Sequence, residues 1–518
     1  MKNIEIKKFK KNRKAYTKVL AGLSFLTLLG TLTTAQEENI KNKKNIIVAQ
    51  GSKPRSLDPY KYNEFPALMI TEHIYNNLIT LDNEGNLVPD LATSWKIISP
   101  REIEFQLREG VKFHNGNDFR ANDVVYSLRR MKAMPGSGIA VDNLESVEAL
   151  DDYRVRLKLK APSSPFIASL ASPLLGIMDE EYSAENEERI GTAPNGTGPF
   201  VFQDWKDGER IILKSNKNYF NGAPKIDGLT FWIITETHNR VIALETGEAQ
   251  IAYAIAPFDA EKIKNHKDIR LETKLTATTD YLALNTNKKI LNNPHLRKAI
   301  SLGINKQSII DSILFGKGQV AKSIVNPKIW GSSEERIEWH YDLEEARKII
   351  KEKGLEGTEL SLWVSDNPTR VQVAQIVQAN LKEIGLNVKI NALEWGTFLQ
   401  KTAMGEHDLL LTTWFIGAPD ADTILRSLIY SKSAGSGGNR SFYQDQAIDE
   451  KLEAAAQSFN PQERLRLYSD IQEIVAMESP VIPIVHKYDT MALSRKVKNY
   501  QYNRATLRNL FEVIDIEN

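Results

Sequence analysis

The sequence predicts a multidomain protein of the mixed α/β and α+β classes. Its 518 residues exceed what one hydrophobic core serves, because single cores stop growing near about 250–300 residues. Short strand-like segments dominate the first half of the chain, and helices alternate with strands in the second half. The alternation is typical of a parallel sheet covered by helices, whereas the early strands indicate a compact α+β unit.

The N-terminal segment predicts a cleavable export signal. Eight basic residues and one acid lie within residues 1–18, an apolar run covers residues 19–32, and the small residues Thr33, Thr34 and Ala35 follow. A secretory signal peptide has these parts in this order, and the apolar run is too short to span a bilayer comfortably. We predict cleavage after Ala35. The alternative, a retained anchor helix, needs about 18 or more apolar residues.

Charge and cysteine content then restrict the partners and the compartment. The chain has a net charge of +1, so removal of the eight cations and one acid leaves about −6 for the mature protein. The basic tail is therefore an export device, and no nucleic-acid partner is expected. The absence of cysteine excludes disulfides, thiolate metal sites and an acylated N-terminal cysteine. We expect a periplasmic protein that is not a lipoprotein, because an exported protein without a lipid anchor needs an enclosing compartment.

Elements of the first half follow from local patterns. Residues 45–50, "NIIVAQ", are strand-like, and the loop at 51–60 contains two prolines and a glycine that stop regular structure. Residues 67–79 have helical spacing, and residues 153–160 alternate like a strand. Between them, "RANDVVYSLRRM" predicts a helix with Asn122 or Asp123 in its first turn.

The sequence predicts helices separated by strands in the second half of the chain. A strand and an amphipathic helix end at Gly247, where glycine suits the C-terminal cap. A helix is predicted over 294–305, with Pro294 in the first turn where its missing N–H costs nothing. A long helix is predicted over 370–385, and the extended segment "PVIPIVHKY" covers 480–488.

The common catalytic and metal-binding motifs are absent from the sequence. No zinc-protease, nucleophile-elbow, P-loop or dinucleotide motif occurs, and the eight histidines are scattered singly. We expect a protein that is not an enzyme and that needs no cofactor or metal. The glycine-rich segment before Arg440 could cradle a phosphate or serve as a linker, and Arg440 itself suits a carboxylate. Trp395 and Trp414 could form the floor of a pocket or pack in the core.

The stretch "WFIGAPDAD" carries two carboxylates, Asp420 and Asp422, beside Trp414. They could form an acid/base pair of a hydrolase, a cation site or a helix cap. Alternate residues on a turn seldom face one another across a substrate, so the hydrolase is the least favoured reading. Asp422 directly precedes a helical pattern, which predicts that it is either the N-cap of that helix or a ligand contact.

Seven segments together resemble a known family. They are similar to the periplasmic substrate-binding proteins of peptide-type ABC importers, solute-binding protein family 5, which includes oligopeptide, dipeptide, glutathione and nickel binders. The segments occur in family order and cover residues 56–60, 87–95, 105–130, 195–205, 244–253, 282–305 and 394–414.

The resemblance implies a two-lobed periplasmic binding protein, type II and cluster C-like, with an extra α+β subdomain. Signal peptide 1–35 precedes lobe I, which combines residues 45–75, 197–283 and 489–518. The extra subdomain covers residues 76–196, and lobe II covers residues 284–488. Two chain crossings form a hinge, and the lobes close over the ligand.

The resemblance also implies a function. The chain is expected to capture a di- or oligopeptide or a glutathione-like solute and deliver it, as a monomer, to an ABC permease and its ATPase. The alternative ligand is a metal chelate of the nickel or haem type. Neither the peptide-like solute nor the metal chelate is expected to be chemically changed by the protein.

The resemblance suggests site residues as well. Dipeptide-type members carry an aspartate three residues after the tryptophan that corresponds to Trp414, and this chain has Gly417 at that position. Glutathione-type members instead have an acidic residue, an alanine and an aspartate in a row, like Asp420-Ala421-Asp422 in this chain. We therefore expect Asp420 to bind the ligand's amino group and Arg440 or Arg370 to bind its carboxylate. The full expected set of ligand-binding residues is Asp420, Trp414, Arg440, Arg370, Asn285, Tyr281 and Trp395, with Asp422 as cap or ligand contact.

Overall fold

The computed structural model describes most of the chain after the N-terminal segment. The described residues are 44–62, 64–82, 86–134, 141–333, 340–414, 420–501 and 509–517. The predicted signal peptide with its cleavage point at Ala35, and Gly417, lie outside the described residues. None of the helices in these ranges is long and apolar enough to cross a membrane.

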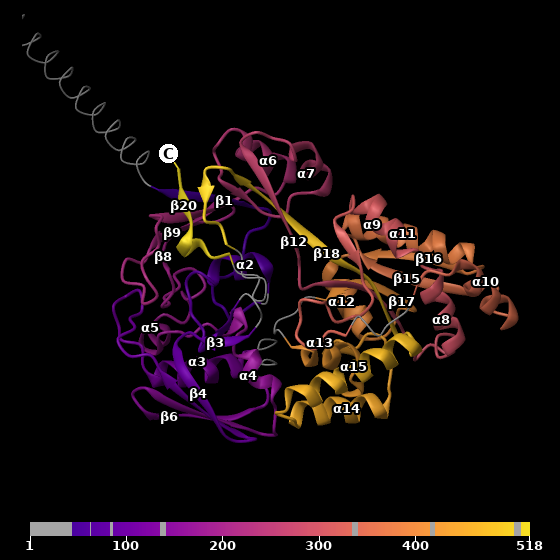
Figure 1. The fold of residues 1–518 in the computed structure, drawn as a ribbon, viewed down its shortest axis with the longest axis horizontal. Coiled ribbons are helices and arrows are strands. Elements are labelled where there is room, and N and C mark those ends of the chain that lie inside the picture. The colour runs from indigo at the N-terminus through magenta and orange to yellow at the C-terminus, as the bar shows by residue number, and fades with distance from the viewer. Residues whose placement is uncertain are drawn as a thin grey trace, which may run out of the picture.

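The molecule has two lobes joined by strands (Figure 1). Lobe I contains strands β1 (Asn45–Gln50), β8 (Phe200–Lys206), β9 (Arg210–Ser215), β10 (Gly228–Ile233), β11 (Ile251–Ala252) and β12 (Ile269–Leu275), helices α2 (Phe65–Thr71), α6 (Thr237–Glu245) and α7 (Pro257–Ile263), and the tail strands β19 (Val497–Lys498) and β20 (Asp515–Ile516). Lobe II contains strands β13 (Thr279–Leu284), β14 (Gly318–Val320), β15 (Glu359–Ser365), β16 (Asn387–Leu393) and β17 (Leu409–Trp414), and helices α8 (Pro294–Gly303), α9 (Lys306–Ile313), α10 (Leu343–Glu352), α11 (Pro368–Glu383), α12 (Trp395–Ala403), α13 (Ala421–Ile429), α14 (Gln446–Gln457) and α15 (Pro461–Glu478).

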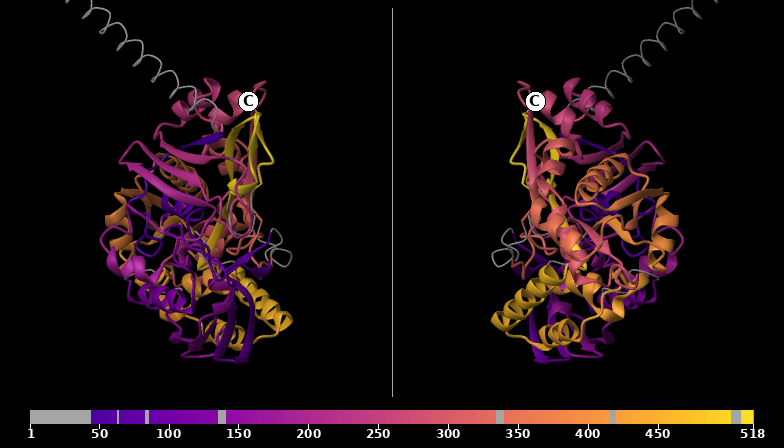
Figure 2. Two further views of the ribbon diagram at one scale, coloured as in Figure 1. Left: turned by 90° about the vertical axis from the view of Figure 1, so that its left-hand side faces the viewer. Right: turned by 90° about the vertical axis from the view of Figure 1, so that its right-hand side faces the viewer.

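One long strand, β18 (Val481–Ser494), belongs to both lobes. Its first residues pair with β13 in lobe II, and its later residues pair with β12 and β11 in lobe I. The sheet order is therefore continuous, β16-β15-β17-β13-β18-β11-β1-β10-β9-β8, with β12 and β14 also paired to β18. The side views place β18 and the C-terminal tail along one side of the molecule (Figure 2). β18 therefore connects the sheets of the two lobes.

An α+β unit packs beside the sheet of lobe I. Its antiparallel sheet has the order β4-β5-β7-β6 and is accompanied by three helices. Its core is continuous with one face of the lobe I sheet, whereas α6 and α7 cover the other face. The unit comprises β4 (Ala92–Ser99), β5 (Glu102–Leu107), β6 (Leu144–Asp151), β7 (Arg154–Leu159), α3 (Ala121–Ala133), α4 (Pro165–Ser169) and α5 (Glu180–Glu185), with the small ribbon β2 (Ile79–Leu81) and β3 (Leu87–Pro89) at its entry.

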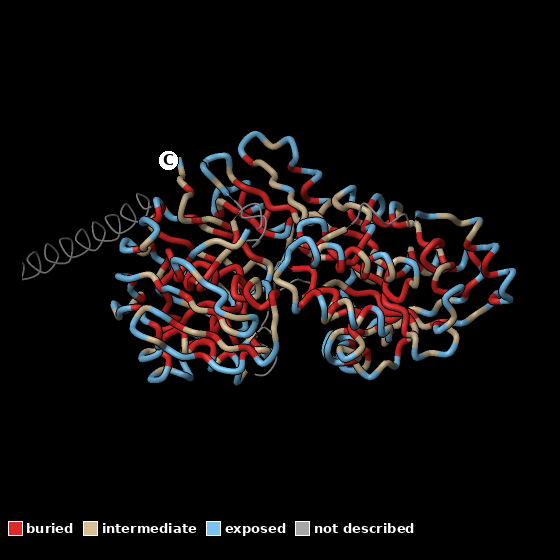
Figure 3. Tube along the Cα trace, turned by 60° about the horizontal axis from the view of Figure 1, so that its bottom comes forward, coloured by how far each residue is buried: buried red, intermediate tan, exposed pale blue. Residues whose placement is uncertain are grey.

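Lobe II has a sheet with a separate apolar core on each face. One core contains side chains of α8, α9, α10 and α11, and the other contains side chains of α13, α14 and α15. Figure 3 shows buried residues through the interior of both lobes, with exposed residues on the outer loops. The mixed α/β and α+β fold and the two lobes agree with the prediction.

Helix starts follow the capping residues that the sequence offers. Asp123 accepts a hydrogen bond from the Arg120 amide in the first turn of α3, as predicted. In α11, Asn367 caps the helix and Pro368 occupies the first turn. The structure differs at α13, because Asp420, rather than the predicted Asp422, is its N-cap.

The helix predicted over 67–79 is wrong beyond Thr71, where α2 ends. The carbonyls of His73 and Ile74 accept hydrogen bonds from the amides of Phe200 and Gly198, so this segment pairs with a distant part of the chain. A Cβ on Gly198 would lie 2.5 Å from the His73 oxygen, so the close approach requires glycine. Tertiary pairing therefore replaces the local helical pattern.

Candidate functional site

Residues far apart in the sequence meet at the edge of lobe II where the connecting strands leave it. β13 begins there and β17 ends there, with Asp280 opposite Thr413 and Thr279 opposite Trp414. The neighbouring β15 runs parallel to β17 and also ends at this edge, at Ser365. Because the long helix α11 follows β15 after a short loop, its first turn reaches the same edge.

Arg370 lies in that first turn of α11 and is half-buried. Its guanidinium donates to the Ser365 hydroxyl at 3.1 Å and to the Thr413 hydroxyl at 2.9 Å. The Thr413 hydroxyl in turn donates to the buried carboxylate of Asp280. Arg370 is thus held in place by two neutral hydroxyls, and no carboxylate among the described residues neutralises it directly.

Lys487 completes this network from the connecting strand β18. Its Nζ lies 2.8 Å from the other carboxylate oxygen of Asp280. Arg370, Thr413, Asp280 and Lys487 therefore form one chain of contacts across three strands and a helix. Two cations share one carboxylate, which leaves the group with a net positive charge.

A cavity of about 280 Å³ adjoins this network. Apolar walls come from Leu314, Val373 and Leu411, and the polar lining consists of Asp280, Asn367, Thr369, Arg370, Thr412 and Lys487. Small-molecule pockets typically measure about 300–1,000 Å³ and combine apolar walls with a few placed polar groups. The cavity has the size and the lining for a small charged solute or one end of a longer one.

Asp489 lies two residues beyond Lys487 on β18 and therefore on the same face of the strand. Burial raises the pKa of its carboxyl group, and the Thr490 amide is its hydrogen-bond donor. Lys274 is opposite Asp489 in the strand register, but its ammonium lies 4.9 Å from the centre of the Tyr500 ring. Within the described residues no cation forms an ion pair with Asp489, so this half-buried carboxylate can accept one.

Tyr281 and Arg440 lie on the other face of β13. Tyr281 is buried, and that burial raises the pKa of its hydroxyl. The Arg440 guanidinium donates to the carbonyl of Gly435, and the Arg440 carbonyl receives a hydrogen bond from His407 Nε2, which lies 2.9 Å away. Of the two arginines predicted for a ligand carboxylate, Arg370 lines the cavity and Arg440 does not.

The structure does not bring Asn285 to the cavity. It is fully buried just beyond the opposite end of β13, roughly 17 Å along the strand from Asp280. Its amide donates to the carbonyls of Gly405 and His407, both at 2.9 Å. The side chain therefore anchors a turn, and a ligand contact for Asn285 stays a prediction.

The two predicted tryptophans occupy different surroundings. Trp414 ends β17 beside the network and packs against the α13–α15 core, and its buried indole N–H has no hydrogen-bond partner among the described residues. Trp395 begins α12, stacks on Phe398 with ring centres 5.5 Å apart and is 49% exposed. Trp414 therefore has an unpaired donor on the face of the sheet opposite Thr413, whereas Trp395 presents an exposed aromatic face.

Asp420 and Asp422 each have an arginine of their own. Asp420 is 3% exposed, accepts the Asp422 amide at 3.0 Å as the helix cap and lies 2.6 Å from Arg464. Burial raises the pKa of Asp420, and the Arg464 charge opposes this rise. Asp422 pairs with Arg426 at 2.9 Å. These contacts give both carboxylates structural roles, and a ligand contact for either stays a prediction.

Sequence reasoning missed Asp280, Lys487 and Asp489. Lys487 lies in the segment 480–488 that was interpreted only as extended, Asp280 and Asp489 lie just outside the segments that were interpreted, and Lys487 and Asp489 stand two residues apart in "HKYDT". Charged residues at alternate positions of an otherwise apolar strand could have marked a polar face. No group of three or more histidines and carboxylates that could hold a metal occurs within the described residues.

Comparisons with known proteins match nearly the whole chain. A model of the bacterial extracellular solute-binding proteins, family 5 Middle, matches residues 86–436. The chain is 30% identical over 505 residues to the Di/tripeptide-binding protein 2 of Pseudomonas aeruginosa, covering 91% of this chain and 94% of that protein. It is 30% identical over 471 residues to the Glutathione-binding protein GsiB of Salmonella typhi, covering 88% of this chain and 92% of that protein.

A solved structure supports the fold assignment. The periplasmic binding protein DppA of Helicobacter pylori, in complex with the peptide STSA, superimposes with a TM-score of 0.80 at 30% identity. The superposition covers 93% of this chain and all of that chain. The two-lobed arrangement is thus shared with a protein that holds a peptide.

Proposed function

Since the chain belongs to the bacterial extracellular solute-binding proteins of family 5, we propose that it captures a short peptide between its lobes for an ABC importer. The names of its relatives, which describe di/tripeptide and glutathione binders, support this ligand class. The observation that carries the proposal is the pairing of a net positive cavity around Arg370 with the unpaired carboxylate of Asp489 on the connecting strand.

The spacing of these groups suits the two charged ends of a short peptide. Side chains two apart on a strand lie roughly 7 Å from each other, and an extended peptide spans at most about 3.3–3.6 Å per residue. Arg370, with Lys487 beside it, would bind the ligand carboxylate, for which a guanidinium fork is well shaped. Asp489 would bind the ammonium group, and Asp280 would position Lys487 directly and Arg370 through Thr413.

The rest of the role follows from the family. The protein would act in the periplasm as a monomer after cleavage behind Ala35 and would pass its ligand, chemically unchanged, to a permease with an ATPase. We propose the domain limits given by the resemblance: lobe I at 45–75, 197–283 and 489–518, the extra subdomain at 76–196 and lobe II at 284–488. Expression of residues 36–518 as one folded, monomeric protein would support the cleavage point and the monomeric state.

Direct identification of the ligand tests the proposal. Native mass spectrometry of the mature protein should show a bound di- or tripeptide or glutathione-like solute that denaturation releases. Calorimetry with an unbiased set of such solutes should then give saturable binding with one site per chain. If no peptide binds, and metal analysis of the same sample finds a chelate instead, the metal-chelate alternative replaces the peptide.

Substitution of Arg370 tests the carboxylate partner. Arg370→Gln should weaken binding of a dipeptide with a free C-terminus by about 10- to 100-fold, because a charged hydrogen bond contributes about 1.5–3 kcal/mol. A C-terminally amidated dipeptide should bind wild-type and variant protein with similar affinity. Arg440→Gln serves as the matched control, and an effect of the same size there would assign the carboxylate to Arg440.

The affinity for the free dipeptide is expected to fall at acidic pH. Because burial raises the pKa of Asp489 in the empty protein, its carboxylate takes up a proton sooner than an exposed aspartate as the pH falls. A protonated carboxyl group does not neutralise the ligand ammonium, so the Kd rises as the pH drops through that raised pKa. The charged residues nearest to it in the strand register are Lys487, two residues before it on β18, and Lys274, opposite it on β12. Calorimetry from neutral pH to about pH 4.5 should show that wild type loses affinity for the free dipeptide more steeply than Asp489→Asn does. If the affinities of both proteins fell in parallel with pH, Asp489 would not be the partner of the ligand ammonium.

A further inference from the structure

A hydrogen-bonded contact joins the α+β unit to lobe II away from the strands that connect the lobes. Ser164, which directly precedes α4, donates its amide to the Ala456 carbonyl at 2.8 Å and its hydroxyl to the Ala455 carbonyl at 3.4 Å. In Figure 1, α4 and α14 meet at the bottom of the molecule, whereas β12 and β18 cross between the lobes above them. The two halves of the molecule therefore touch on the side opposite their connection.

The two carbonyls belong to the last turn of α14, where the helix itself supplies no amide for them. The carbonyl of Ala454, one residue earlier, receives the Ser458 amide at 3.0 Å within lobe II. Ala455 and Ala456 are 0% and 9% exposed, so their carbonyls need a partner from outside the helix. Ser164 supplies that partner from the α+β unit.

Ser164 is fixed firmly to its own unit. The residue is buried, and Phe166 and Ile167, which follow it in α4, belong to the hydrophobic core of the α+β unit. The Asn143 side chain accepts the Ala161 amide at 3.1 Å and donates to the Ala161 carbonyl at 2.9 Å, which holds the chain just before Ser164. The donor therefore moves with the whole unit.

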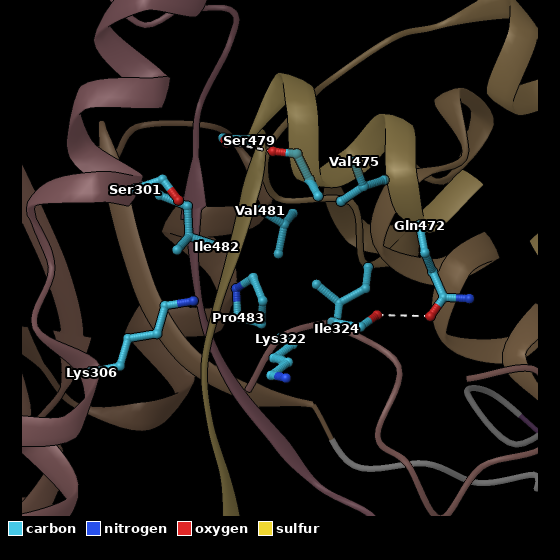
Figure 4. A pocket seen from close by; sticks show the side chains of 12 residues that line it. Ser301, Lys306, Lys322, Ile324, Gln472, Val475, Ser479, Val481, Ile482 and Pro483 are labelled. Carbon is cyan, nitrogen blue, oxygen red and sulfur yellow. Dashed lines mark hydrogen bonds between the residues drawn. The ribbon is translucent and has the colours of Figure 1, made fainter. Parts of the chain in front are cut away.

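The end of α14 is tied in turn to the body of lobe II. α14 and α15 share one core, and Lys451 of α14 lies 3.1 Å from the Asp470 carboxylate of α15. In Figure 4 the Gln472 side chain points from α15 toward the loop that carries Ile324. It accepts the hydroxyl of Ser323 in that loop at 2.8 Å. A rotation of one lobe against the other would therefore break the contact at α14 before it bent the helix.

We propose that Ser164 latches the two lobes in their closed arrangement and thereby slows the release of bound ligand. The inference rests on the proposed function, because such a latch acts only on a ligand held between lobes that open and close. The lining of the cavity around Arg370 does not include Ser164, so Ser164 is a positioning residue that acts on closure. Water hydrates the carbonyls when the lobes open, so the latch shifts the closed-to-open ratio by about one net hydrogen bond, or about 2- to 10-fold.

Substitution of Ser164 by proline tests the latch. The φ of Ser164 is −66°, which the proline ring adopts, and Ser164→Pro removes the amide hydrogen together with the hydroxyl. The dissociation rate of a dipeptide, measured by stopped flow, should rise by about 2- to 10-fold, whereas the association rate should stay within about 2-fold because the ligand enters the open form. Ser163→Ala changes the neighbouring serine and should leave both rates at the wild-type value.

The outcomes separate the latch from the proposed function. A wild-type dissociation rate in Ser164→Pro, with the dipeptide still bound, would overturn the latch and leave peptide capture in place. Absence of dipeptide binding to the wild-type protein would contradict peptide capture and the latch together.

Hydrogen exchange in the wild-type protein gives a result that does not depend on a variant folding. With the dipeptide at about 100 times its Kd, the Ser164 amide should exchange at least about 10-fold more slowly than in the free protein, because closure protects it. The Lys160 amide donates to the Asn143 carbonyl at 2.8 Å within the same unit, so its exchange should not change. Mass spectrometry of the exchanged protein measures both amides. Equal exchange of the Ser164 amide with and without bound dipeptide would overturn the proposal.

Discussion

Asp489→Asn is expected to weaken binding of a free dipeptide by about 10- to 100-fold, since a buried charge pair contributes about 1.5–3 kcal/mol and its loss leaves the ligand ammonium unpaired. The substitution keeps the size of the side chain and its hydrogen bond from the Thr490 amide. No described ion pair is broken by it, so stability should be unchanged or slightly higher. Calorimetry at neutral pH measures the change in Kd.

A matched pair of ligands and a matched variant separate this effect from a general disturbance. The N-acetylated dipeptide lacks the ammonium group and should bind wild type and Asp489→Asn alike. Asp268→Asn changes an exposed carboxylate in the same lobe. It should leave the affinities for the free and the N-acetylated dipeptide unchanged. If Asp489→Asn bound the free dipeptide as tightly as wild type, Asp489 would not be the ammonium partner.

Arg464→Met is expected to destabilise lobe II by about 3–5 kcal/mol, because it removes one partner of a buried ion pair and leaves the Asp420 carboxylate unpaired. Arg464 also lies against Trp330, with the guanidinium 4.6 Å from the ring centre. Trp330 is one of eight tryptophans in the chain, so tryptophan fluorescence during urea unfolding reports this region together with the others. The midpoint of the unfolding transition should move to a lower urea concentration.

The double variant Asp420→Asn/Arg464→Met provides the control. Asparagine is as good an N-cap as aspartate, so the cap of α13 is retained while both buried charges are removed. The double variant should recover much of the stability lost in either single variant. Additive losses would mean that the pair makes no net contribution. An unchanged peptide Kd in folded Asp420→Asn would remove Asp420 from the ligand site.

Features that depend on local sequence could be predicted. The alternation of helices and strands gave the fold class, and the Asn-Pro pair at 367–368 marks the start of α11. The resemblance named Arg370 and Trp414 as ligand-binding residues, and in the structure both lie where β15 and β17 end, while their contact with a ligand stays a prediction. These predictions rest on a few neighbouring residues or on segments in a fixed order.

Features that depend on distant pairing could not be predicted. Asp280 and Lys487 are 207 residues apart, and their contact depends on the register of β13 and β18, which shifts at Asp280 and Tyr281. The partner of Asp420 is Arg464, which lies 44 residues away on α15, so this contact could not be predicted either. Local patterns show which face of a strand is buried, but they do not show which distant strand it pairs with.

The most direct test of the account compares one dipeptide with its two end-blocked forms on the wild-type protein. Calorimetry at neutral pH and moderate salt should show tight binding of the free dipeptide and about 10-fold or greater losses for both the N-acetylated and the C-amidated forms. This result follows if Asp489 and Arg370 each bind one charged end. Equal affinities for all three ligands would contradict the account.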